Sequence, residues 1–328
     1  MTTHATPPLT HTGMVRGCPF NAEEYVAGLA GLGTPERSAR GGFSILTRPI
    51  PGTDMSDGVG PWPYLWISGP DDIAALHEDF RHLLTVTAVT QPGYVPDGAT
   101  VDAALLKMHY VYDPGRPPAP MSRRARLRLR RCEERASFDV VVPFARRMRM
   151  AAIHARLVSR RGLPGDYTSF TLQHFEALAR LESSVFFEVR DADGIGAMAC
   201  GVLFGEQLQI LHMAGTDEGL RWNASYLLMA GLQQYATEYG VQLMTGGMPD
   251  TGTDGLRIFK QRWANHSEPV YLLRVVNDKP AYAALCGHRL AETPFFPAYR
   301  APAAGRDAAL SAQTRHHAQH ERPDAKQA

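Results

Sequence analysis

The second half of the chain alternates between strand-like and helix-like hydrophobic patterns in a regular order. Strand patterns occur at 138–142, 185–190, 195–204, 208–214, 241–245 and 270–276. Apolar residues at helical spacing predict helices at 144–160, 171–181, 223–239 and 255–263. Turn-forming sequences join the three strands between 185 and 214, which predicts an antiparallel meander. A right-handed crossover through the helix at 223–239 then makes the strand at 241–245 parallel to the strand at 208–214.

The first half has a less regular pattern. Strand patterns at 43–48, 64–67, 83–89 and 105–112 surround a helix at 71–80. A proline-rich stretch at 114–120 predicts a connector, and the polar segments 1–20 and 301–328 predict disordered ends. The order of strands and helices along the whole chain predicts an α+β protein with a mixed, mostly antiparallel sheet flanked by helices.

Positive charge is concentrated in one segment, although the whole chain of 328 residues has a formal net charge of only +1. Residues 115–161 hold 14 arginines and 3 acids, which is a net charge of +11. Ser122 is the predicted N-cap of a helix with the densest group, Arg123, Arg124, Arg126, Arg128, Arg130 and Arg131. Arg146 and Arg147 begin a second group. Such an excess favours a phosphate-rich partner, and the alternative is a solvated helix face whose arginines pair with nearby acids.

Composition and motifs exclude several classes of protein and of mechanism. With 44% hydrophobic residues the chain is typical of a globular protein, and no run of 18 apolar residues predicts a membrane span. The N-terminal residues lack the pattern of a secretory signal, and the four cysteines form no CxxC pair. We therefore expect a cytoplasmic protein with free thiols and no metal site. No GxSxG, HExxH or P-loop motif supports a covalent nucleophile or a catalytic metal.

Three segments resemble the Fem-like branch of the GNAT acyltransferases. The first is the arginine-rich stretch 122–131, which is similar to the basic segment that bridges the two halves of these proteins. The second is HMAGTD at 212–217 with ASYLL at 224–228. The third, DGLRIFKQRW at 254–263, matches the family pattern Asp-Gly, Phe-Lys and Phe or Trp three residues later. No heptad repeat predicts the coiled-coil arm that some family members carry.

The resemblance implies tandem GNAT-like halves and an activity. It places a degenerate first domain at 21–120, an arginine-rich bridging helix at 121–137 and a catalytic domain at 138–300. The implied activity is transfer of an aminoacyl group from aminoacyl-tRNA to an amine, with tRNA held by the arginines and no further cofactor. A small-molecule acceptor is expected, as in the Fem-like enzymes of antibiotic and other specialised metabolism; a cell-wall precursor is the alternative.

Lys260 is the central candidate of the implied site. It is one of only four lysines, and the matching lysine of Fem-like enzymes lies beside the reacting ester, where a cation stabilises the oxyanion. Phe259 would form an apolar wall or stack on the terminal adenosine, while Asp250 or Asp254 would bind the amine or accept its proton. The candidates for substrate binding are His212, Ser225, Tyr226, Arg257 and Trp263. The alternative roles are structural, namely core packing for the rings and capping or turn formation for the aspartates.

The segment 216–223 bears on the identity of the acyl donor. GNAT enzymes of the usual kind bind the coenzyme A pyrophosphate with backbone N–H groups of a glycine-rich loop that opens a helix. Here the segment has one glycine and two acids, Asp217 and Glu218, and acids repel a pyrophosphate. Acyl-coenzyme A is therefore the disfavoured donor and the first alternative. A non-catalytic protein that binds nucleic acid is the second alternative.

Overall fold

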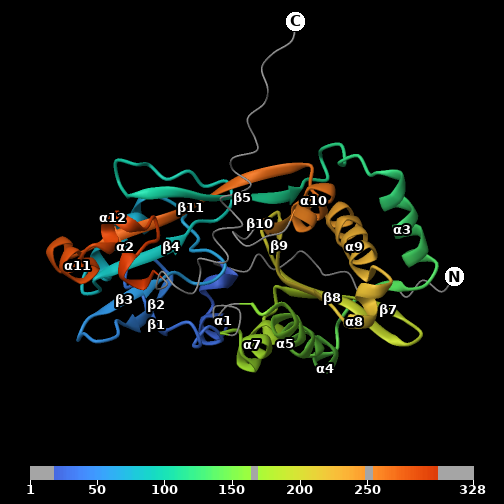
Figure 1. Cartoon of the computed structure of the whole chain (residues 1–328), viewed down its shortest axis with the longest axis horizontal. Helices are drawn as coiled ribbons and strands as arrows, with labels where there is room; N and C mark the ends of the chain where they lie inside the picture. Colours follow the sequence, from blue (N-terminus) through green and yellow to red (C-terminus); the bar gives the residue numbers. More distant parts are fainter. Residues whose placement is uncertain (1–17, 164–168, 248–253, 302–328) are drawn as a thin grey trace, which may run out of the picture.

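The computed structural model describes residues 18–163, 169–247 and 254–301. Its strands are β1 (Thr34–Arg37), β2 (Ser44–Pro49), β3 (Ser56–Val59), β4 (Thr85–Val89), β5 (Ala103–Tyr112), β6 (Ser137–Val140), β7 (Ser184–Asp191), β8 (Gly194–Phe204), β9 (Gln207–Gly215), β10 (Gln242–Gly247) and β11 (His266–Val276). All of them join one sheet in the order β1-β2-β3-β4-β11-β5-β10-β9-β8-β7-β6 (Figure 1). The predicted disordered ends lie outside the described residues, apart from 18–20 and 301.

Helices cover both faces of this sheet (Figure 1). They are α1 (Glu23–Ala27), α2 (Pro70–Asp79), α3 (Arg123–Glu133), α4 (Phe144–Arg147), α5 (Arg149–Arg161), α7 (Leu172–Arg180), α8 (Asp217–Arg221), α9 (Ala224–Tyr239), α10 (Asp254–Arg262), α11 (Lys279–Cys286) and α12 (Arg289–Glu292). Two short 3-10 turns complete the set, η1 (Pro19–Asn21) and η2 (Ala298–Arg300). The predicted α+β class, with a mixed and mostly antiparallel sheet, is confirmed.

The second half follows the predicted order closely. β7, β8 and β9 form the antiparallel meander, and β10 lies parallel to β9. Gly162 and Gly240 end α5 and α9 in the left-handed conformation, at φ 57° and 66°, which glycine adopts without a steric penalty. Ser122 caps α3 as predicted, because its hydroxyl oxygen accepts a hydrogen bond from the backbone N–H of Ala125.

Two local predictions are wrong. The helix expected at 144–160 is two helices, since a tight turn at Met148, whose carbonyl accepts from the N–H of Ala151, separates α4 from α5. The strand expected at 64–67 contributes only a single bridge, Leu65 to Thr90. It is preceded by Pro63, which has no N–H to donate to a ladder.

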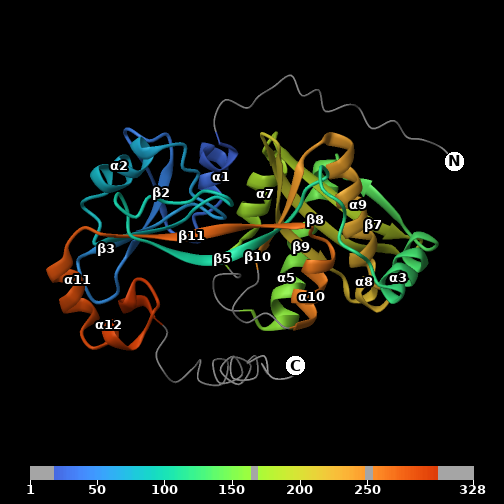
Figure 2. The ribbon, with the colours of Figure 1, turned by 90° about the horizontal axis from the view of Figure 1, so that it is seen from above.

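The two halves share the sheet through a ribbon made of β5 and β11. β11 pairs with β4 over Leu272–Val276 and with β5 over His266–Leu273, whereas β5 pairs with β10 only near its end. Figure 2 shows this long ribbon running from one half to the other. α11 and η2 then return to the first half, where Arg300 forms an ion pair with the buried carboxylate of Asp57. The predicted bridging segment 121–137 contains α3.

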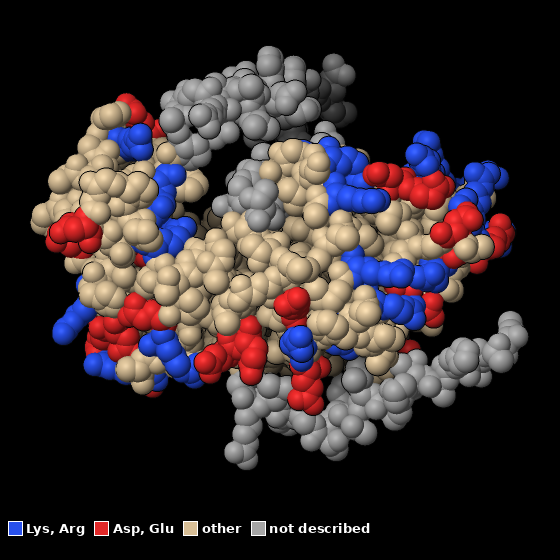
Figure 3. All heavy atoms as spheres, turned by 90° about the horizontal axis from the view of Figure 1, so that it is seen from below, with Lys and Arg blue, Asp and Glu red and all other residues tan. Residues whose placement is uncertain are grey.

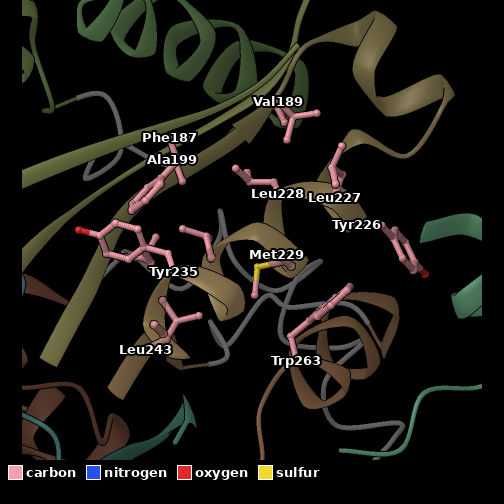
Figure 4. Packing of buried hydrophobic residues seen from close by; sticks show 14 of the residues in the cluster. Phe187, Val189, Ala199, Tyr226, Leu227, Leu228, Met229, Tyr235, Leu243 and Trp263 are labelled. Carbon is pink, nitrogen blue, oxygen red and sulfur yellow. The ribbon is translucent and has the colours of Figure 1, made fainter. Parts of the chain in front are cut away.

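A separate apolar core lies on each face of the sheet in the second half. α9 packs its apolar side on one face, around Phe187, Leu228 and Trp263 (Figure 4). The core on the other face includes Phe175 of α7 and Tyr64 of the first half, so it spans the junction between the halves. Burying a large apolar side chain contributes about 1.5–3 kcal/mol, and the junction is therefore a cohesive part of the fold.

Candidate active site

β9 and β10 part after a short parallel pairing, and this is where the candidate site begins. They pair only between Gln207–Gln209 and Gln242–Met244, although β9 continues to Gly215 and β10 to Gly247. The side chain of Gln209 lies at the point of parting. Its amide nitrogen donates to the carbonyl of Ile210 in β9 at 2.7 Å and to that of Met244 in β10 at 3.5 Å.

Lys260 reaches from α10 to the end of β10. Its Nζ donates to the carbonyl oxygens of Thr245 at 3.0 Å and Gly247 at 2.7 Å. Burial, and after it the charge of Lys107, lowers the pKa of Lys260 to about 8. An ammonium has three N–H donors, so among the described residues one donor is left uncommitted. The predicted catalytic ammonium is thus charged at neutral pH and held in place at the parting of the strands.

Lys107 approaches the same place from β5. A side chain at Gly247 would begin only 2.7 Å from Cδ of Lys107, so glycine leaves room for the lysine stem. The preceding Gly246 has φ 76°, a conformation that disfavours other residues. The two glycines that end β10 therefore let the two lysines meet. We refer to Lys107 and Lys260 as the lysine pair.

A hydrogen-bond chain determines the tautomer of His109, which faces Gly247 across the ladder. Because Gln209 gives its amide N–H groups to carbonyls, its Oε1 accepts from the Tyr64 hydroxyl at 2.9 Å. The Tyr64 oxygen must then accept from Nδ1–H of His109, at 2.8 Å. Nε2 of His109 therefore carries a lone pair, and it is buried without a partner among the described residues. Burial, followed by the charges of the lysine pair, lowers the pKa of His109 to about 3.

Aromatic rings cluster where α10, the helix that carries Lys260, packs against α9. Phe259 is half-buried, and its ring lies 5.8 Å from that of Tyr226 and 6.3 Å from that of Trp263. Arg128 and Arg262 both stack on Tyr226 and donate to its hydroxyl, at 3.1 and 2.8 Å. Trp263 is 1% exposed and belongs to the α9 core. These contacts bring four of the predicted site residues, Phe259, Tyr226, Trp263 and Arg128, close to one another.

Other predicted site residues are less well placed or not described. Ser225 is half-buried at the start of α9, and Arg257 is exposed on α10. Asp254 begins α10, but its side chain lies outside the described residues, as does all of Asp250. Their predicted roles stay predictions.

His212 lies in a different environment, which we call the histidine cluster and which consists of His154, His174 and His212. Nε2 of His212 is 2.9 Å from Nε2 of His174, and both residues are at least 95% buried. The rings of Trp62, Phe170 and Phe175 surround them. Burial lowers the pKa of all three histidines, to about 3 for His174. This packing is the structural alternative for His212, and no metal-binding group of three or more ligands occurs within the described residues.

The arginines divide into a solvated set and a bonded set. On α3 the exposed side chains are Arg123, Arg124, Arg126, Arg130 and Arg131, and none of them pairs with a carboxylate in the described part of the chain. Arg146 pairs with buried Glu188, and Arg147 donates to the carbonyls of Val141 and Ala179. One charged face appears in Figure 3, with blue side chains among red ones toward the right of the view.

The segment before α9 is occupied by its own protein contacts. The hydroxyl of Thr216 accepts from the N–H of Gly219, and Asp217 pairs with Arg160. A side chain at Gly219 would overlap the carbonyl of Gly196. These N–H and acidic groups are therefore engaged within the protein.

No family model matches this sequence, and no curated protein matches it. Among solved structures, FemX matches with a TM-score of 0.56 and 12% identity, covering 83% of this chain and 95% of that chain. An Agrobacterium fabrum C-terminal domain (DUF2156), assigned to lysylphosphatidylglycerol synthetase, has a TM-score of 0.54 and 17% identity, covering 83% and 91%. L-PGS from Bacillus licheniformis has a TM-score of 0.52 and 17% identity, covering 78% and 88%. The fold is therefore similar to that of FemX and of these two lysylphosphatidylglycerol synthetase structures.

The structure adds three functional candidates that the sequence did not single out. Lys107 was visible as one of four lysines, but its strand is far from Lys260 in sequence. His109 and Gln209 belong to no sequence motif.

In the described part of the chain, no helix has both the length and the apolar character needed to cross a bilayer.

Proposed function

We propose that this chain transfers an aminoacyl group from aminoacyl-tRNA to the amine of a small molecule, with formation of an amide bond. The observation that supports it best is the ammonium of Lys260, which is fixed on two carbonyls at the parting of β9 and β10. An ammonium in this position is suited to stabilise the oxyanion that forms when an amine attacks an ester.

The reaction needs only positioning and this electrostatic contribution. The neutral amine attacks the ester carbonyl, the carbon–nitrogen bond forms, and the negative charge on the oxygen is opposed by Lys260. The intermediate then expels the ribose oxygen, which receives the proton lost by the amine. The positive charges of the lysine pair also disfavour a further cation nearby. A bound amine is therefore kept in the neutral form that attacks the ester.

RNA is the proposed donor carrier because of the exposed arginines on α3. Five exposed guanidinium groups without carboxylate partners among the described residues form a surface that suits phosphates. Coenzyme A fits less well, since the N–H of Gly219 is already bonded to Thr216.

Mass spectrometry of candidate amines incubated with charged tRNA pools tests the proposal. We expect an amide product that disappears after ribonuclease treatment. The Lys260→Ala variant should lower kcat by about 100- to 1000-fold, the usual loss for one oxyanion donor, while tRNA affinity changes by about ten-fold at most. A product formed from acyl-coenzyme A instead, or equal losses of turnover and tRNA binding, contradicts this assignment.

A further inference from the structure

We propose that one nucleotide of the donor RNA binds beside α9, with its phosphate between Arg128 and Arg262 and its base in the adjoining cavity. This inference rests on the proposed function, because it gives a place to part of the donor of that reaction. Its basis is the convergence of two guanidinium groups from different helices, α3 and α10, on the hydroxyl oxygen of Tyr226. That oxygen accepts a hydrogen bond from Arg128 at 3.1 Å and from Arg262 at 2.8 Å.

We refer to Arg128 and Arg262 as the arginine pair. Their guanidinium carbons lie 5.7 and 5.5 Å from the centroid of the Tyr226 ring, and both residues are half-buried. The Tyr226 hydroxyl points away from the other labelled side chains in Figure 4. A guanidinium has five N–H donors, and Tyr226 takes one from each arginine. No carboxylate among the described residues forms an ion pair with either arginine, so their remaining donors are available to an anion.

Stacking on an aromatic ring explains one arginine but not two. Arg180 stacks alone on Phe144, at 4.9 Å. Arg135 stacks on Trp222 and also pairs with Asp191, which opposes its charge. In the arginine pair, two cations share one phenol oxygen, which offers lone pairs but no negative charge, so the cations repel each other. A phosphate between them removes this repulsion and accepts hydrogen bonds from both guanidinium groups.

An open cavity of about 670 Å³ lies next to the arginine pair, between α3 and α9. Its lining includes Leu129 and Trp263, which directly follow the two arginines in the sequence. It also includes Ala230, about one helical turn after Tyr226 in α9. Glu238 lines the cavity about two turns beyond Ala230, so the acidic end of the cavity is remote from the arginine pair. This polarity places a phosphate at the arginine end.

The lining of the cavity suits a nucleobase. Met121 and Leu129 supply apolar surface, and Gln234 supplies an exposed amide. Trp263 is buried, and its indole N–H has no hydrogen-bond partner among the described residues. A buried donor without a partner is costly, and the ring nitrogens and carbonyl oxygens of a base are acceptors that can satisfy it.

Binding of an uncharged RNA hairpin that ends in CCA is the first test, since it is independent of turnover. We expect Arg128→Gln and Arg262→Gln each to weaken this binding by about ten-fold or more, because each removes a charge-assisted contact. Each should also reduce the slope of log K against log salt concentration by about one. Arg180→Gln is the matched control, because it removes an exposed arginine that stacks on the ring of Phe144, and its affinity should stay within about two-fold of wild type.

Modified RNAs then locate the phosphate and the base. Each linkage near the 3′ end is replaced in turn by an uncharged methylphosphonate. At one linkage we expect wild type to bind as weakly as Arg262→Gln binds natural RNA, with no further loss in the variant. Ala230→Phe narrows the cavity and should weaken binding of natural RNA, whereas RNA that lacks the base beside that linkage should bind wild type and variant equally. Should Ala230→Phe not fold, as judged by circular dichroism, Gln234→Trp narrows the cavity from an exposed position.

The inference is overturned if both variants of the arginine pair bind the hairpin as wild type does, or if Arg180→Gln loses as much as they do. It is also overturned if the pair holds the phosphates of coenzyme A and not those of RNA, as shown by loss of coenzyme A binding alone in Arg262→Gln. Failure of the proposed function is a separate result: RNA binding that depends on the arginine pair then persists while no tRNA-derived amide forms. Conversely, amide formation with unchanged kinetics in Arg128→Gln and Arg262→Gln sinks the nucleotide site alone.

Discussion

The histidine cluster and the lysine pair both lie near β9 and β10, and they differ in charge and in surroundings. Burial lowers the pKa of all three histidines, His174 and His212 lie within hydrogen-bond distance of each other, and aromatic rings enclose them. The lysines are cations that repel each other at the end of β10. Neutral imidazoles enclosed by rings are a common part of a core, whereas a buried ammonium whose pKa is lowered toward neutrality is typical of a functional site. The comparison shows that burial of a polar residue does not by itself indicate a functional site.

The largest expected effect that separates the two regions is on stability. His212→Ala leaves a cavity and removes the partner of His174, so we expect a loss of about 3 kcal/mol in the free energy of unfolding. Urea denaturation measures this loss, and kcat of the folded variant should stay within a few-fold of wild type. A hundred-fold fall in kcat with unchanged stability instead assigns His212 to the active site.

Tyr64 connects the first half of the chain to the candidate site, so its removal sharpens the comparison. Tyr64→Phe leaves Nδ1 of His109 and Oε1 of Gln209 without their partner, at an expected cost of about 1–3 kcal/mol in stability. Tyr25→Phe is a suitable control, since it removes a hydroxyl that donates to the carbonyl of Trp62 in the same core. His109 faces Gly247, whose carbonyl holds Nζ of Lys260, so we expect the loss of its fixed tautomer to disturb that lysine and only the Tyr64 variant to lower kcat. Equal kcat in both variants shows that the tautomer of His109 does not matter for Lys260.

Acid should destabilise the protein through its buried histidines. Their folded-state pKa values lie below the ordinary value of 6.5, near about 3 for His174 and His109, so the unfolded chain binds more protons between these limits. Stability is therefore complete above pH 6.5 and decreases as the pH falls toward 3, by up to about 1.4 kcal/mol per pH unit for each histidine. Urea titrations from pH 7 to 4.5 measure the slope, and His174→Phe should reduce it; an unchanged slope shows that the cluster does not titrate in this way.

The smallest expected effect is on the pH profile of the proposed activity, on its alkaline side. Activity should fall as pH rises through about 8, because Lys260 then loses its charge. Lys107→Met removes a repelling cation, so the pKa of Lys260 rises and the limb moves upward. The shift should be only part of the total lowering, since burial is the larger cause. A pH profile of kcat that does not move shows that the lysines are not coupled.

Much of this fold could be predicted from the sequence, because its signals are local. Periodic apolar residues gave the meander, the crossover helix and the parallel strand that follows it, and Ser122, Gly162 and Gly240 marked helix ends. The pairing of β11 with β4 was not predictable in this way. It joins residues from opposite ends of the chain, and no local pattern reports such a partner.

The sequence by itself determined the classes of side chain available for chemistry: an arginine-rich helix and a lysine in a Phe-Lys-x-x-Trp context, in a chain with only four lysines. Only the tertiary structure decided which of them meet. It brought Lys107 to Lys260 across two glycines, and it placed His212 among aromatic rings beside His174. The physical reason is that charge repulsion, desolvation and hydrogen bonding depend on distances of a few ångströms, and here those distances join elements far apart in the sequence, β5 with α10 and α7 with β9.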